Sequence, residues 1–142
     1  MKVKVKQLHP NAKIPQYAKP GDAGLDLVAV DREINDKYIE YKTGLAFEIP
    51  EGYVGLLFPR SSITKYDLLL KNSVGVIDSS YRGEVLLRFY DAGENGEWDY
   101  YYNIGDKVGQ LMILPYPSIE LEKVEELSTT ERGAGGYGST GK

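Results

Sequence analysis

Residues 75 to 85 read GVIDSSYRGEV and place one acidic side chain at the end of an otherwise apolar stretch. GVI (75–77) is typical of a short buried strand, the two serines of a turn and residues 85–87 of a return strand. The segment therefore predicts a β-hairpin, with Gly83 relaxing its backbone. Asp78 lies at the tip of this hairpin, where it can be aimed at a ligand. The alternative is that Asp78 only caps the turn by accepting backbone N–H groups, which is common for aspartate in loops.

Composition limits the classes of protein to which the chain can belong. Its 142 residues, 42% of them hydrophobic, fit one domain with a single core. A net charge of −4 argues against binding to a nucleic acid polymer. The absence of cysteine removes disulfides and thiol chemistry, and a lone His9 is a poor basis for a metal site. Without a long apolar run or a signal peptide pattern, we expect a cytoplasmic protein that does not enter a membrane.

Short strand-like segments separated by turn residues run through the chain. The helix that the pattern permits begins at Ser61 or Ser62 and continues to about Asp67. Asn95-Gly96 predicts a further hairpin turn. The segments with strand patterns, of which the last is an edge strand, are 2–6, 38–49, 53–58, 85–90, 97–102, 108–116 and 118–127. The sequence therefore predicts an all-β fold, a distorted β-barrel or jelly roll with one short helix.

Polar residues at four places in or between these segments are candidates for a site. Arg60 and two hydroxyls at the helix start could cradle a phosphate, or could be an ordinary cap beside a surface arginine. Asp26 points away from its leucine neighbours and is either a hydrogen-bonding anchor or a site residue. Asn72 could read a planar base edge or could only form a turn. Gln110, inside an apolar strand, predicts a buried network or a ligand contact.

The last eleven residues, RGAGGYGSTGK (132–142), contain five glycines. They match the letters of a dinucleotide-binding motif from Gly133 and of a P-loop from Gly136, but the strand and helix that each motif requires are not predicted around them. Their hydroxyls, cations and backbone N–H groups could still wrap a polyphosphate, while Tyr137 could stack on a ring. The alternative is a disordered terminus.

Five short segments contain these candidate residues, and they occur in the order AGLDL (23–27), PRSS (59–62), NSVGVIDSSYRGE (72–84), GDKVGQLMI (105–113) and RGAGGYGSTG (132–141). Taken together, they resemble the five motifs of the trimeric dUTP pyrophosphatase (dUTPase) family. Small departures from the family are Ser62-Ile63 in place of the frequent Gly-Leu, Gly109 in place of Ala, Tyr137 in place of Phe, and a longer segment 91–105.

The resemblance implies a jelly-roll homotrimer with active sites at its subunit interfaces. Residues 1–127 would form the core, and residues 128–142 a flexible glycine-rich arm that closes an active site of the trimer. The implied reaction is Mg²⁺-dependent hydrolysis of dUTP to dUMP and pyrophosphate. This reaction limits uracil incorporation into DNA and supplies dUMP for dTMP synthesis.

The resemblance also implies a role for each motif residue. Asp78 would activate the attacking water, and Asp26 would contact Mg²⁺ through water, the metal being held mainly by substrate phosphates. The uracil edge would be read by Asn72, Gly75, Val76 and Ile77, the deoxyribose would contact Tyr81, and Leu86 would add a backbone contact. The phosphates would be held by Arg60, Ser61, Ser62 and Gln110. From another subunit's arm, Tyr137 would stack on uracil, beside Arg132, Gly138, Ser139 and Thr140.

Two other functions compete with this one. A dCTP deaminase is related in fold, although that family lacks the complete glycine-rich closing tail. A β-trimer that binds a nucleotide or a partner protein without turnover is the non-enzymatic alternative. Asp78 favours the hydrolase over the second.

Overall fold

The computed structural model describes residues 1–92 and 101–136, and strands dominate this part of the chain. Its single helical element is a short 3₁₀ helix, η1 (Ser61–Lys65). The strands are β1 (Lys4–Gln7), β2 (Leu25–Val28), β3 (Asp31–Ile34), β4 (Ile39–Lys42), β5 (Leu45–Glu48), β6 (Tyr53–Phe58), β7 (Leu68–Leu70), β8 (Gly75–Ile77), β9 (Leu86–Asp91) and β10 (Lys107–Pro115). The all-β prediction is confirmed.

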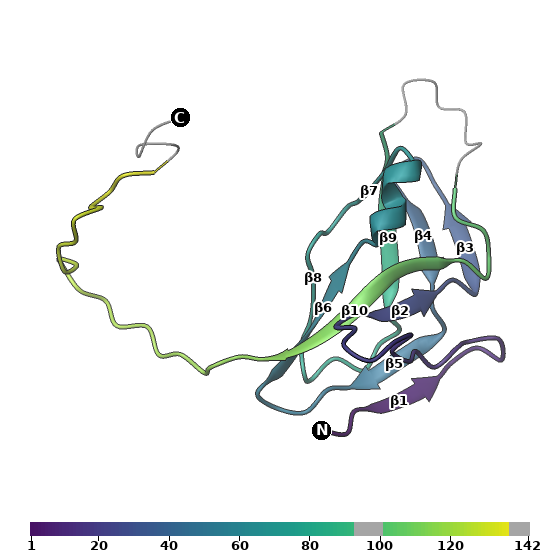
Figure 1. The fold of residues 1–142 in the computed structure, drawn as a ribbon, viewed down its shortest axis with the longest axis horizontal. Helices are drawn as coiled ribbons and strands as arrows, with labels where there is room; N and C mark the ends of the chain where they lie inside the picture. The colour runs from purple at the N-terminus through teal and green to yellow at the C-terminus, as the bar shows by residue number, and fades with distance from the viewer. Residues whose placement is uncertain (93–100, 137–142) are drawn as a thin grey trace.

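Two four-stranded antiparallel sheets, with orders β2-β10-β6-β8 and β3-β4-β9-β7, make up most of the fold (Figure 1). A third, two-stranded sheet joins β1 to β5. Among the described residues no ladder connects the outer strands of the two large sheets, so the predicted barrel is not closed. No helix in this part of the chain is long and apolar enough to cross a membrane.

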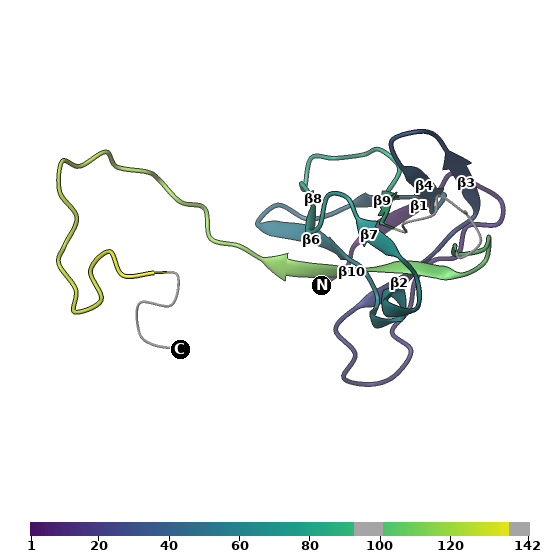
Figure 2. The ribbon, with the colours of Figure 1, turned by 90° about the horizontal axis from the view of Figure 1, so that it is seen from above.

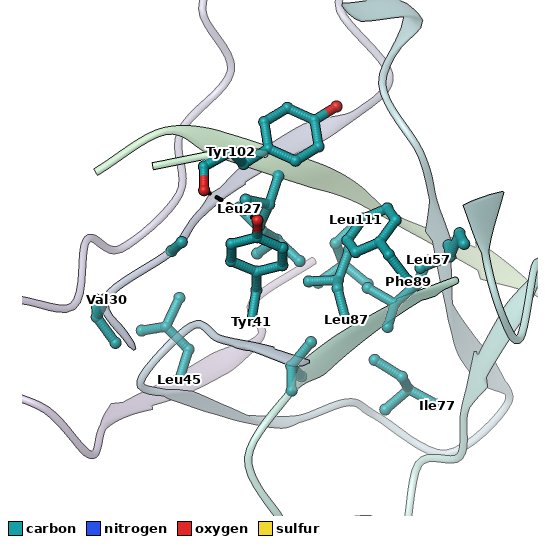
Figure 3. Close-up of a cluster of buried hydrophobic side chains, with 14 of the residues drawn as sticks. Leu27, Val30, Tyr41, Leu45, Leu57, Ile77, Leu87, Phe89, Tyr102 and Leu111 are labelled. Atoms are coloured by element: carbon teal, nitrogen blue, oxygen red, sulfur yellow. Dashed lines mark hydrogen bonds between the residues drawn. The ribbon is translucent and has the colours of Figure 1, made fainter. Parts of the chain in front are cut away.

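The hydrophobic core lies where the two large sheets contact each other (Figure 3). Leu27 and Leu111 come from the first sheet, and Tyr41 and Phe89 from the second; all four are fully buried. The rings of Tyr41 and Phe89 meet edge to face with centroids 5.7 Å apart. The hydroxyl of Tyr41 donates to the carbonyl oxygen of Tyr102 at 2.9 Å, so this polar group is buried with a partner.

The predicted hairpin over residues 75–85 is wrong. Strand β8 pairs with β6, whereas β9 pairs with β4 and β7 in the other sheet. Residues 78–85 therefore cross from one sheet to the other. Hydrogen bonds to the β4–β5 turn fix this crossing, because Val85 donates to Leu45 and accepts from Thr43.

Other predicted elements differ in their limits. The predicted strand 38–49 is divided into β4 and β5 at Gly44, where φ is +66°, and residues 118–127 form no strand. The predicted helix is only η1, and its N-cap Arg60 makes no side-chain capping bond. The Asn95-Gly96 hairpin lies outside the described residues.

The chain leaves the sheets after β10 (Figures 1 and 2). The N–H of Tyr116 still donates to the carbonyl of Gly52 at 3.0 Å. Beyond it, large apolar side chains such as Leu121 and Leu127 are 88% and 85% exposed. The expected division between core and arm at residues 127 and 128 stays a prediction.

Candidate active site

A pocket of about 310 Å³ opens beside β8 and is called here the β8 pocket. Gly75 and Ile77 are buried in this strand, whereas Val76 points outward, so the pocket presents strand backbone as well as side chains. Seven of the predicted substrate or catalytic residues meet here: Asn72, Gly75, Val76, Ile77, Asp78, Tyr81 and Leu86. Leu57, Glu84, Val85 and Arg88 complete its lining.

Asp78 follows the last residue of β8 and has an exposed side chain. The turn after it is closed by backbone groups, because the N–H of Tyr81 donates to the Asp78 carbonyl at 3.0 Å. Within residues 1–92 and 101–136, the Asp78 carboxylate itself has no hydrogen-bond or ion-pair partner. The carboxylate therefore does not cap the turn, and both of its oxygens are available to a water molecule or a ligand.

The Tyr81 side chain packs against the later residues of its own crossing segment, 78–85. Its hydroxyl donates to the carbonyl of Glu84 at 3.1 Å. A Cβ at Gly83 would overlap the Tyr81 ring, so the glycine provides the space that the ring occupies. The glycine thus allows the ring to lie in this position, in addition to the backbone role predicted from the sequence.

A second pocket, of about 490 Å³, lies near the ends of β2 and β10 and is called here the β10 pocket. Of the predicted site residues it collects Asp26, Arg60, Ser61 and Gln110, together with Lys19, Asp22, Gly24 and Lys107 and with Ala18, Ala23 and Met112. Predicted phosphate-binding residues therefore lie together, apart from the residues predicted to bind the nucleoside.

Asp26 forms ion pairs with two cations at the edge of the β10 pocket. Arg60 Nε lies 2.7 Å from its Oδ1, and Lys107 Nζ lies 2.8 Å from its Oδ2. Burial raises the pKa of Asp26, but the Lys107 hydrogen bond and the charge and hydrogen bond of Arg60 outweigh it. The pKa of Asp26 is therefore below its ordinary value. Asp26 thus acts as a hydrogen-bonding anchor in this structure, and its predicted role as a site residue stays a prediction.

Gln110 is also fixed in the β10 pocket. Its side-chain nitrogen donates to the carbonyl of Pro59 at 3.0 Å, and a Cβ at Gly24 would overlap its side-chain oxygen. Ser62 does not line this pocket but contacts a residue that does, with its Oγ 3.5 Å from Arg60 Nη1 and 3.5 Å from the Tyr102 hydroxyl. These contacts fix the side chains of Arg60, Ser62 and Gln110, which are predicted to bind phosphate, before any substrate is present.

The two pockets lie at opposite edges of one sheet. In the order β2-β10-β6-β8, strand β2 borders the β10 pocket and strand β8 borders the β8 pocket. These two strands are separated by three strand spacings of about 4.8 Å each. They share no lining residue. Arg132 lies in the arm and donates to Gly135, and the predicted contacts Tyr137, Gly138, Ser139 and Thr140 lie outside the described residues. The described part of one chain does not bring all the predicted site residues together.

The dUTPase family model matches residues 10–141. The chain belongs to the dUTPase family. A deoxyuridine 5'-triphosphate nucleotidohydrolase of Desulfitobacterium hafniense is 43% identical over 135 residues, covering 91% of this chain and 87% of the relative. One from Clostridium tetani is 38% identical over 143 residues, covering 99% and 97%. A mutant dUTPase of Staphylococcus bacteriophage 80alpha, solved with dUpNHpp, has a TM-score of 0.85 at 28% identity, with 99% of both chains covered.

Two residues of this dUTPase that we had not assigned a role contact the predicted site. Lys107 pairs with Asp26, and Glu84 lines the β8 pocket. Both lie inside motifs already quoted, 105–113 and 72–84, so their positions were visible in the sequence. Their partners could not be predicted, because Lys107 pairs with Asp26 and Glu84 accepts a hydrogen bond from the Gly44 N–H, and both partners are distant along the chain.

The side chains described in this dUTPase suit a metal ion that is bound mainly by substrate phosphates more than one that is bound mainly by protein groups. Among the described residues no group of three His, Cys, Asp or Glu side chains is placed to bind a metal ion. Both oxygens of Asp26 already accept hydrogen bonds from cations. A contact from Asp26 to Mg²⁺ through an intervening water is compatible with this arrangement, since magnesium keeps several of its waters.

Proposed function

We propose that this protein hydrolyses dUTP to dUMP and pyrophosphate, limiting uracil incorporation into DNA and supplying dUMP for dTMP synthesis. The observation that carries the proposal is the Asp78 carboxylate at the edge of the β8 pocket, which has no partner among residues 1–92 and 101–136. Support comes from the names of the relatives, which are deoxyuridine triphosphate nucleotidohydrolases, and from the phage dUTPase solved with dUpNHpp.

In this proposal the β8 pocket takes the nucleoside. The backbone of Gly75, Val76 and Ile77, together with the Asn72 amide, offers donors and acceptors to the uracil edge, as an uncharged planar ligand requires. Tyr81 packs on the deoxyribose, and Leu86 adds a backbone contact.

Asp78 is the general base of the proposed reaction. Its carboxylate accepts a proton from a bound water as the water oxygen attacks the α-phosphorus in line with the leaving pyrophosphate. A carboxylate already engaged in a turn or an ion pair would be a weaker acceptor. Because no described residue forms a hydrogen bond or ion pair with either Asp78 oxygen, the carboxylate suits this role.

The β10 pocket supplies the phosphate contacts. Arg60, Ser61, Ser62 and Gln110 hold the phosphates, with Arg60 oriented by Asp26 before the substrate arrives. Fixed donors stabilise a developing negative charge without reorganising during the reaction. When bound, Mg²⁺ neutralises phosphate charge, and the residue that would contact it, through water, is Asp26.

The proposed assembly is a homotrimer whose active sites combine subunits. Two observations support it: the β8 and β10 pockets lie at opposite sheet edges, and the arm leaves its own sheets with apolar side chains exposed. In a closed ring each subunit can give its β8 pocket to one neighbour and receive a β10 pocket from another. The arm residues Arg132, Tyr137, Gly138, Ser139 and Thr140 would then close over the bound nucleotide.

Measuring pyrophosphate release from dUTP in the presence of Mg²⁺ tests the proposal directly. We expect turnover with dUTP and none with dCTP. Ammonia release from dCTP would show a deaminase, and tight binding of dUTP without pyrophosphate release would show a nucleotide-binding protein without catalysis. Either result would overturn the proposed function.

A further inference from the structure

The segment that carries Asp78 is attached to the turn between β4 and β5 through Glu84. Oε1 of Glu84 accepts a hydrogen bond from the Gly44 N–H at 2.7 Å, although the two residues are 40 positions apart in the sequence. The next residue continues the attachment: Val85 N–H donates to Leu45 at 2.8 Å, and Thr43 Oγ1 donates to the Val85 carbonyl at 2.7 Å.

The β4–β5 turn is a rigid support for this attachment. A Cβ at Gly44 would lie 2.7 Å from the His9 Cβ and 2.9 Å from the Ala12 Cβ, so neighbouring chain encloses the turn. The Gly44 carbonyl accepts from the Leu8 N–H at 2.7 Å, and Thr43 is fully buried. The Glu84 carboxylate therefore accepts from an N–H whose position is set by packing on several sides.

Glu84 holds the pocket residues from two sides. Its carboxylate fixes the end of the crossing segment to the Gly44 N–H, and its own carbonyl accepts the Tyr81 hydroxyl at 3.1 Å. Tyr81 in turn closes the turn that begins at Asp78. A continuous series of contacts thus connects the buried β4–β5 turn to the residue proposed as general base.

We propose that Glu84 is a positioning residue, which sets the orientation of Asp78 and Tyr81 through its hydrogen bond to the Gly44 N–H. The inference rests on the proposed function, because it explains how the base of that reaction is held. It assigns no chemical step to the Glu84 carboxylate, although this side chain lines the β8 pocket. Misplacing a catalytic group by about 1 Å can cost on the order of a hundredfold in rate.

Three substitutions at Glu84 distinguish the effect of side-chain length from the effects of charge and of folding stability. Glu84→Gln keeps the length and an acceptor oxygen but removes the charge, whereas Glu84→Asp keeps the charge but is one methylene shorter. Glu84→Ala removes both. Glu48→Ala is the control, since Glu48 is an exposed glutamate on β5 paired with Lys4 at 2.7 Å and does not line the β8 pocket.

The experiment measures kcat by pyrophosphate release, the affinity and stoichiometry of dUpNHpp binding, Tm, and amide hydrogen exchange at Gly44. We expect kcat to fall by about 10-fold to 100-fold in Glu84→Ala and Glu84→Asp. Glu84→Gln should stay within about threefold of wild type, because a neutral oxygen still accepts the Gly44 N–H. Amide hydrogen exchange at Gly44 should be faster than in wild type in the alanine and aspartate variants only. Every variant should still bind one dUpNHpp molecule per chain.

Three results would overturn the inference. Wild-type kcat in Glu84→Ala would show that the contact does not matter, and equal losses in the glutamine and alanine variants would show that the charge takes part directly. A loss of kcat explained by fewer binding-competent chains would show a purely structural role. If the alanine variant does not fold, the aspartate and glutamine variants decide. A wild-type protein that releases no pyrophosphate overturns the proposed function itself, whereas an active wild type with an unaffected Glu84→Asp variant overturns this inference alone.

Discussion

Arg60 donates from Nε to Oδ1 of Asp26 at 2.7 Å, connecting the second residue after β6 to the middle of β2. Lys107 occupies the other oxygen of the same carboxylate. Asp26 therefore balances part of the positive charge that the β10 pocket would offer to phosphates, and it fixes where that charge lies. The arrangement weakens the electrostatic attraction for phosphate but holds the Arg60 guanidinium in a fixed orientation.

The ion pairs of Asp26 predict an acid-sensitive contribution to stability. Because the folded pKa is below the unfolded value of about 3.9, the contribution is present above that value and is lost as pH falls through the folded pKa. Asp26→Asn should lack this contribution, on the order of 1 kcal/mol, so the variant should lose less of its free energy of unfolding on acidification. Urea unfolding from pH 7 to pH 2 measures this.

Asp22→Asn is the control, because it changes the net charge equally and Asp22 lines the same pocket. Lys107→Gln provides a second approach, since it removes one of the two cations that favour ionised Asp26. If the free energy of unfolding falls equally with decreasing pH in wild type and in Asp26→Asn, the prediction is wrong.

Local pattern in the sequence predicts which residues are buried but not which strands become neighbours. Alternation around Leu25 and Leu27 correctly placed Asp26 on the other face, where it has its two cationic partners. The hairpin prediction for residues 75–85 was wrong because the return of the chain is decided by Thr43 and the turn beside it. Those contacts span about forty residues and have no local signal.

The candidate site shows the same limit. Its residues were predicted from motifs, since each motif occupies one short segment. Their division between two pockets follows from the strand order β2-β10-β6-β8, which places segments from separate motifs at opposite edges. Lys107 and Glu84 were missed for a related reason: a charged residue in a motif shows its function only when its partner is known.

Asp78→Asn should bind substrate but turn it over slowly. Its carboxylate has no structural partner among the described residues, so the substitution should leave Tm nearly unchanged. We expect kcat to fall at least about a hundredfold, the usual cost of removing a general base, while dUpNHpp still binds with Mg²⁺. Asp36→Asn, at an exposed aspartate that does not line the β8 pocket, is the matched control. Turnover within a few fold of wild type would remove Asp78 from the proposed mechanism.

Deleting residues 132–142 should separate activity from folding. In residues 1–92 and 101–131 the core is complete without this segment, because every buried core side chain precedes residue 112. The truncated protein should therefore keep its Tm within a few degrees and its trimeric mass by light scattering, but lose most of its activity. Unfolding or dissociation would instead make the tail structural.

Mixed trimers test whether one site uses several subunits. Chains with Asp78→Asn and chains lacking residues 132–142 should each be nearly inactive alone. After unfolding and joint refolding, some sites should combine an intact Asp78 with an intact tail from another chain, and activity should return in part. If verified mixed trimers stay inactive, each subunit closes its own site.

In the proposed function we expect Tyr81 to discriminate between dUTP and UTP, which differ by one 2′-hydroxyl. Tyr81 lines the β8 pocket and is 46% exposed, and its hydroxyl donates to the Glu84 carbonyl at 3.1 Å. A ring packed on the sugar leaves no room and no partner for the extra hydroxyl. Rejection therefore combines steric conflict with lost hydration and can exceed the roughly 1–3 kcal/mol of a purely apolar pocket.

Comparing kcat/KM for dUTP and UTP in wild type, Tyr81→Ala and Tyr81→Phe tests this role. The alanine variant should lose much of its preference for dUTP, because the surface that excludes the 2′-hydroxyl is gone. The phenylalanine variant keeps the ring and loses only the bond to Glu84, so its preference should fall little. Equal losses on both substrates in Tyr81→Ala would show that the ring supports the crossing segment without reading the sugar, since a purely structural defect affects the two transition states alike.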